Sequence, residues 1–91
     1  MYVLISNVTD DTGSLNVINV RCVSNDNKEI KAKLLNIIMD NLNDIDDGDE
    51  VTITSGRNSE TDGQYVSLVH KINDGYLKTW YEIQEVEELK N

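Results

Sequence analysis

The segment from residue 26 to residue 43 limits the fold most strongly, because it has the pattern of one amphipathic helix. Its apolar residues recur at spacings of three and four, the period of a helix that buries one face. They are Ile30, Leu34, Leu35, Ile37, Ile38 and Leu42. Asp26 and Glu29 have the spacing of a capping box at the start of a helix. The sequence therefore predicts a helix over residues 27–43.

Five other segments are short and rich in β-branched or aromatic residues, which is typical of β-strands. They cover residues 2–6, 15–23, 50–56, 64–72 and 76–86. Clusters of turn-forming residues separate most of them, at 10–14, 57–63 and 73–75. The order β-β-α-β-β-β predicts one α+β domain over residues 1–91. We expect an antiparallel or mixed sheet with the amphipathic helix packed on one face.

Alternation along a strand predicts which side chains share a face, since successive residues point to opposite sides. In the second strand segment, Ile18, Val20 and Cys22 are predicted to share a face. Val51 and Ile53 are predicted to point inward from the third.

Trp80 and Tyr81 are adjacent in the last strand segment, so they point to opposite faces and one of them is expected in the core. The other is predicted to be an exposed aromatic anchor of the kind that carries interface energy. Tyr65 and Tyr76 are expected to extend that aromatic patch.

The composition is acidic: 8 Lys and Arg stand against 17 Asp and Glu, for a formal net charge of −9. Such a chain repels phosphate backbones and anionic lipids, so we expect no direct binding of nucleic acid or of a membrane. The charge serves either solubility or attraction to a basic partner. Because the chain has one cysteine, Cys22, and no apolar leader-like segment, we expect a cytoplasmic protein.

Metal, cofactor and catalytic sites are not predicted. If Gly48 takes the sixth position of a calcium loop, Ile45 and Thr54 fall where oxygen ligands are required, and neither residue fits. One His and one Cys do not make a tetrahedral zinc set without carboxylates. We find no recognisable catalytic arrangement and no glycine-rich phosphate loop, so the chain is expected not to be an enzyme.

Acidic residues gather in three clusters, at 10–11, 40–50 and 82–88. Carboxylates two residues apart on a strand lie about 6.6 Å apart, close to two steps of a DNA strand at roughly 6.8 Å. A firm surface with this spacing can occupy a DNA-binding groove. The alternative is that each cluster is a solvated turn or tail. The residues predicted to bind a partner are Asp44, Asp46, Asp47, Asp49, Glu50, Trp80, Glu82, Glu85, Glu87 and Glu88.

The order of elements resembles that of small acidic α+β proteins of phages. The resemblance is carried by "YVLIS" at 2–6, "VSNDNKEIKAKLL" at 23–35 and "WYEIQEVEEL" at 80–89. It is a pattern of elements and assigns no functional residue. It implies a class of activity by analogy: a DNA mimic or inhibitor that blocks a host nucleic-acid-binding protein, such as a restriction or CRISPR nuclease.

Two other functions remain open from the sequence. The first is a structural or assembly module that forms a homo-oligomer through a sheet edge, since the chain has no Pro to protect such an edge. The second is a small hydrolase or metal-dependent enzyme, which requires a deep pocket containing His70 or Cys22.

Overall fold

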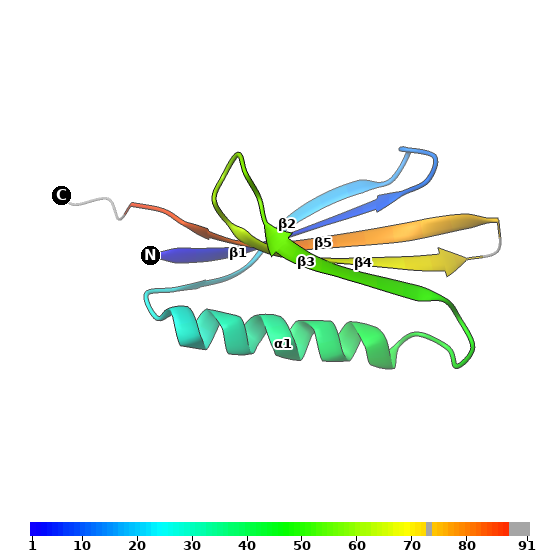
Figure 1. Ribbon diagram of the computed structural model, residues 1–91, viewed down its shortest axis with the longest axis horizontal. Coiled ribbons are helices and arrows are strands. Elements are labelled where there is room, and N and C mark those ends of the chain that lie inside the picture. Colours follow the sequence, from blue (N-terminus) through cyan, green and yellow to red (C-terminus); the bar gives the residue numbers. More distant parts are fainter. Residues whose placement is uncertain (73, 88–91) are drawn as a thin grey trace.

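The computed structural model describes residues 1–72 and 74–87. Within them the chain forms one five-stranded antiparallel sheet and one helix, which confirms the predicted α+β order (Figure 1). The elements are β1 (Tyr2–Asp10), β2 (Asn16–Ser24), α1 (Asn27–Asn43), β3 (Val51–Arg57), β4 (Gln64–Ile72) and β5 (Gly75–Glu85). The strand order is β2-β1-β5-β4-β3, so β2 and β3 are the two outer strands. Asn73, in the predicted turn between β4 and β5, lies outside the described residues.

The helix has the predicted bounds because its first turn is capped by a side chain. The Asp26 carboxylate accepts a hydrogen bond from the backbone N–H of Lys28 at 2.9 Å. A capping box also has a second bond, from the Asp26 N–H to the Glu29 carboxylate, and this part of the prediction is wrong. The Asp26 N–H donates to the Ser24 hydroxyl at 3.0 Å, and that hydroxyl donates to the Glu29 carboxylate at 3.3 Å. Ser24 therefore stands between the two residues that were expected to bond directly.

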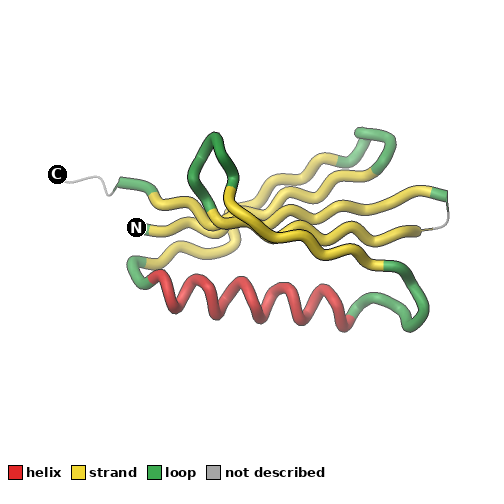
Figure 2. Tube along the Cα trace, in the orientation of Figure 1, coloured by secondary structure: helices red, strands yellow, loops and turns green. Residues whose placement is uncertain are grey.

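The core lies between α1 and one face of the sheet, here called the helix face. Its buried hydrophobic residues are Leu4, Ile30, Leu34, Leu68, Tyr81 and Ile83. α1 packs against β1, β2 and β5, and Figure 2 shows it running along the strands on one side of them. The Tyr81 hydroxyl accepts a hydrogen bond from Asn41 Nδ2 at 2.9 Å, which satisfies the polar end of this buried ring.

A β-bulge makes the predicted face of β2 wrong. Leu4 pairs with Cys22, but the next residue, Ile5, pairs with Val20, so Arg21 is an extra residue in β2. The bulge shifts the alternation by one residue. Cys22 therefore lies on the helix face, while Val20 lies on the opposite face together with Ile18. We call that opposite face of the sheet the open face, because α1 does not cover it.

The helix covers too narrow a strip of the sheet to bury all the residues that were expected to be inside. Leu35 is 63% exposed and Ile53 is 54% exposed, so both predictions of burial are wrong. Leu35 lies about 140° around the helix from Ile30, at 100° per residue. Within the described residues α1 makes no close backbone contact with β3, and so nothing covers Ile53 on the helix face.

Candidate interaction surface

Three acidic turns lie at one end of the molecule. The β1–β2 turn, the α1–β3 turn and the β4–β5 turn share this end, as Figure 1 shows, because β1, α1 and β4 all run toward it. We call this end, with its eight carboxylates, the acidic end. Its members are Asp10, Asp11, Asp44, Asp46, Asp47, Asp49, Glu50 and Asp74.

Close contacts hold the three turns against one another. A Cβ atom added to Gly75 would lie 2.7 Å from both carboxylate oxygens of Asp11, so the first and third turns touch. Lys71, at the end of β4, donates its backbone N–H to the Glu50 carbonyl at 3.0 Å, and its Nζ lies 3.3 Å from Glu50 Oε2. His70 Nε2 lies 3.0 Å from Asp49 Oδ2. The acidic end is therefore one contiguous surface.

The α1–β3 turn is a folded turn with its own hydrogen bonds. The N–H of Ile45 donates to the Leu42 carbonyl, and the N–H of Asp49 donates to the Asp46 carbonyl, each at 3.2 Å. Gly48 adopts φ +93°, a conformation that favours glycine. The DNA-like spacing of carboxylates two residues apart requires an extended strand, and so it does not apply to Asp47 and Asp49 in this turn.

Asp10 organises the β1–β2 turn. Its carboxylate accepts hydrogen bonds from the Thr12 hydroxyl, the Ser14 hydroxyl and the Leu15 N–H, at 3.0, 3.2 and 3.3 Å. Desolvation alone raises the pKa of Asp10, but these hydrogen bonds outweigh it and hold the pKa below its usual value of 3.8. The bonds keep the carboxylate ionised and fix the direction of the turn.

The third predicted cluster is not brought to this surface. Glu85 is the last residue of β5 and pairs with Tyr2 at the end of the sheet where the chain starts. Glu87 follows Val86, whose carbonyl accepts a hydrogen bond from the Met1 ammonium at 3.2 Å. Glu85 and Glu87 therefore lie at the opposite end from the acidic end (Figure 1). Glu88 lies outside the described residues.

Glu82, which was predicted to bind a partner, is only 4% exposed on the open face. Desolvation by itself raises the pKa of this carboxyl, but hydrogen bonds hold the pKa below its usual value of 4.5. The hydrogen bonds come from Asn58 Nδ2 at 2.9 Å, Thr61 Oγ1 at 3.0 Å, Trp80 Nε1 at 3.2 Å and Gln84 Nε2.

The bonds to Glu82 fasten the β3–β4 loop, residues 58–63, over the open face. A Cβ atom added to Gly63 would lie 2.8 Å from the Ile83 carbonyl oxygen, which shows how closely the loop approaches β5. In this arrangement Glu82 holds the loop and has little surface left for a partner to contact.

Trp80 also lies on the open face, away from the acidic end. Its ring stacks on Tyr65, with 4.1 Å between centroids and 14° between planes. Lys78 Nζ lies 5.5 Å from the centroid of the Trp80 ring. Of the adjacent aromatic pair, Tyr81 is therefore the core residue, and Trp80 is half-buried in a small aromatic cluster.

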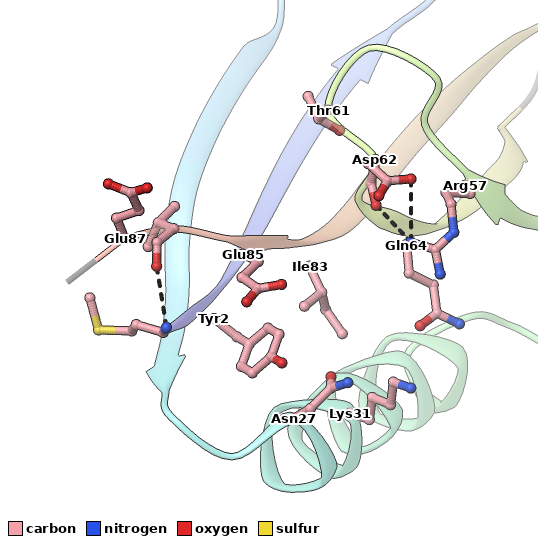
Figure 3. A pocket seen from close by; sticks show the side chains of 12 residues that line it. Tyr2, Asn27, Lys31, Arg57, Thr61, Asp62, Gln64, Ile83, Glu85 and Glu87 are labelled. Atoms are coloured by element: carbon pink, nitrogen blue, oxygen red, sulfur yellow. Dashed lines mark hydrogen bonds and ion pairs between the residues drawn. The ribbon is translucent and has the colours of Figure 1, made fainter.

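A groove of about 1030 Å³ lies at the end opposite the acidic end, between the start of α1 and the ends of the strands (Figure 3). Tyr2 and Ile83 give it apolar walls, and its rim carries charges of both signs, such as those of Lys31 and Glu85. Neither His70 nor Cys22 lines this groove.

The charged groups do not converge on a metal site in the part of the chain that the structure describes. No three His, Cys, Asp or Glu side chains there stand close enough to hold an ion. His70 meets a single carboxylate, that of Asp49. The same part of the chain contains no helix with the length and apolar character needed to span a membrane.

Sequence reasoning missed Asp74 as a member of the acidic end. It also did not join the cluster at 10–11 to the cluster at 40–50. The usable signal was the direction of the strands: in an antiparallel order with one helix, residues 10–14, 44–50 and 74–75 all fall at the same end.

Comparisons of the chain with models of protein families, with curated proteins and with solved structures find no match.

Proposed function

We propose that this protein is a non-enzymatic binding protein whose acidic end docks in the cationic groove of a nucleic-acid-binding protein. By occupying that groove, it keeps nucleic acid out. The observation that carries the proposal is the acidic end itself: eight carboxylates from three turns that lie together on one surface. Lysine and arginine side chains that normally bind phosphates are the complementary groups.

The strength of such an interface would come from the number of charges. A single exposed ion pair contributes roughly 0–1 kcal/mol. A whole surface of one sign steers the approach of an oppositely charged partner and raises the association rate, most strongly at low salt. The proposed complex therefore weakens as ionic strength rises.

The resemblance to small acidic phage proteins directs the choice of partner. Restriction and CRISPR nucleases bind DNA in cationic grooves, and they are the first partners to test. Under this proposal the protein competes with DNA for the nuclease and makes no contact with DNA itself, since its net charge of −9 repels a phosphate backbone.

The first prediction concerns capture of a basic partner at low and at high salt. The wild-type chain is expected to retain a nucleic-acid-binding protein at low salt and to release it at high salt. The triple variant Asp46→Lys, Asp47→Lys and Asp49→Lys is expected to lose this capture, because it reverses the sign of the α1–β3 turn. Circular dichroism checks that the variant is folded.

The matched control is Glu60→Lys, Glu85→Lys and Glu87→Lys. These three exposed residues lie outside the acidic end, and the net charge changes by the same amount. The proposal expects the control to keep most of the affinity. Equal loss in both variants assigns the effect to net charge alone, and unchanged capture by the first variant overturns the proposal.

A further inference from the structure

The outer strand β2 has the most apolar exposed edge of the sheet. It pairs with β1 on one side, and its other side forms the boundary of the sheet. Every residue from Asn16 to Val20 is exposed. Ile18 and Val20, both on the open face, are 64% and 65% exposed, and Val23 is 51% exposed. An outer strand with unpaired backbone groups and exposed aliphatic side chains is a template for another strand.

The chain does not protect this edge with charge. Residues 12–25 contain no Asp or Glu, which makes them the longest acid-free stretch of the sequence. The one charged residue in β2 is Arg21, in the bulge. The other outer strand differs: β3 follows directly on Asp49 and Glu50, and most of its residues are polar. Of the two outer strands, β2 is therefore the one that has exposed aliphatic residues and no Asp or Glu beside them in the sequence.

The distribution of charge favours a second copy of this chain as the occupant of the edge. Two copies of a chain with net charge −9 repel each other, and the local repulsion is weakest where carboxylates are absent, as they are in β2. When two copies pair β2 with β2 about a two-fold axis perpendicular to the sheet, the two β2 strands run antiparallel. Antiparallel pairing points the two acidic ends in opposite directions along the strands, which keeps them farther apart than parallel pairing would.

We propose that the protein forms a two-fold dimer through the outer edge of β2, with residues 16–20 of each copy paired and Ile18 near the axis. The bulge at Arg21 limits the regular ladder to this exposed half of the strand. On the open face Ile18 meets its own copy, and Val20 meets the partner copy near the start of its β2. The result is a continuous ten-stranded sheet.

The dimer gives the molecule a property that one chain does not have. It presents two acidic ends that point in opposite directions, so it can engage two cationic surfaces at once. Dimerisation through β2 does not depend on what the acidic end binds, and each can fail without the other.

The second prediction concerns the mass of the protein in solution, measured by light scattering across a dilution series. The wild type is expected at about twice the 10.3 kDa of one chain. The double variant Ile18→Glu and Val20→Glu is expected at the mass of one chain, because it gathers four carboxylates at the axis. Both side chains are largely exposed, so the fold does not need them.

The control is Ile53→Glu, which places one carboxylate on an exposed aliphatic position of the other outer strand. It is expected to stay dimeric. A single-chain mass for the wild type at every concentration overturns the proposal. A dimer that survives the β2 changes, or that dissociates equally with Ile53→Glu, also overturns it.

Hydrogen exchange gives a readout that needs no variant. Outward amides of residues 16–20 are expected to exchange more slowly at high protein concentration than at low, while those of β3 stay unchanged. Added salt is expected to strengthen the dimer by screening its net charge, whereas it weakens capture of a basic partner by the acidic end. Equal exchange at both concentrations, or weakening of the dimer by salt, counts against the β2 contact.

Discussion

At the scale of single residues, the same side-chain type has two roles that depend on its surroundings. Asp46 and Asp47 are exposed in a turn, where they add charge to a surface. Glu82 is 4% exposed, and its hydrogen bonds come from four neutral side chains. Its carboxylate is thus stabilised by hydrogen bonds that compensate for lost hydration, and it fastens a loop.

The third prediction concerns Glu82→Gln, measured by urea unfolding. The variant keeps the shape but loses the charge and presents an amide N–H₂ to donors that need an acceptor. It is expected to lose roughly 1–3 kcal/mol of unfolding free energy at neutral pH. Folding lowers the pKa of Glu82. The contribution of the ionised carboxylate to the free energy of unfolding is therefore fully present above the usual pKa of 4.5, and it is lost as the pH falls through the lower folded-state pKa. The difference between wild type and variant therefore shrinks in acid.

Glu85→Gln is the control, since it makes the same change at an exposed residue of β5. It is expected to alter stability by less than about 0.5 kcal/mol. If Glu82→Gln and Glu85→Gln behave alike at neutral pH, the network around Glu82 does not stabilise the loop.

At the scale of elements, the sequence predicted what depends on local chemistry. The bounds of α1 follow from the Asp26 cap and the apolar period, and both are local signals. The faces were harder to predict. One extra residue at Arg21 reversed the orientation of half of β2, and a bulge leaves no mark in a run of alternating residues. Whether Leu35 and Ile53 are buried depends on where the helix lies on the sheet, and this is decided by tertiary packing, not by the local sequence.

The fourth prediction tests that narrow contact by comparing two adjacent leucines in the same helix. Leu34→Ala is expected to destabilise the fold by roughly 2–5 kcal/mol, because Leu34 is 6% exposed and packs in the core. Leu35→Ala is expected to cost less than about 0.5 kcal/mol, because Leu35 is 63% exposed. Thermal or urea unfolding measures both. Similar costs for the two leucines contradict the placement of α1.

At the scale of the whole molecule, charge is arranged along the long direction of a body that measures 51 × 25 × 21 Å. The candidate site was predicted in part: the residues of the α1–β3 turn belong to it, and Glu85 and Glu87 do not join them. The composition gives the amount of acidic charge but not its location in the fold. Only strand direction shows that the turns meet at one end, and only the folding back of residues 58–63 removes Glu82 from the surface.

The last prediction uses the cost of gathering like charges. Carboxylates at the acidic end repel one another in the free protein, so replacing two of them by neutral residues should stabilise the fold. Asp46→Asn with Asp47→Asn is expected to give a small rise in Tm at low salt, which disappears at high salt because salt already screens the repulsion. Glu87→Gln, at the other end, is expected to give no such rise.

If the carboxylates served only solubility, they could be spread over the whole surface, where they would repel one another less. A surface that binds a cationic partner needs its carboxylates gathered together, and the protein then loses some stability in exchange for binding. The Asp46→Asn and Asp47→Asn variant should therefore be more stable and bind less, when unfolding and capture are measured on the same preparation. A lower Tm at low salt would mean that these two carboxylates take part in stabilising contacts, and the acidic end would then be a structural feature of the fold.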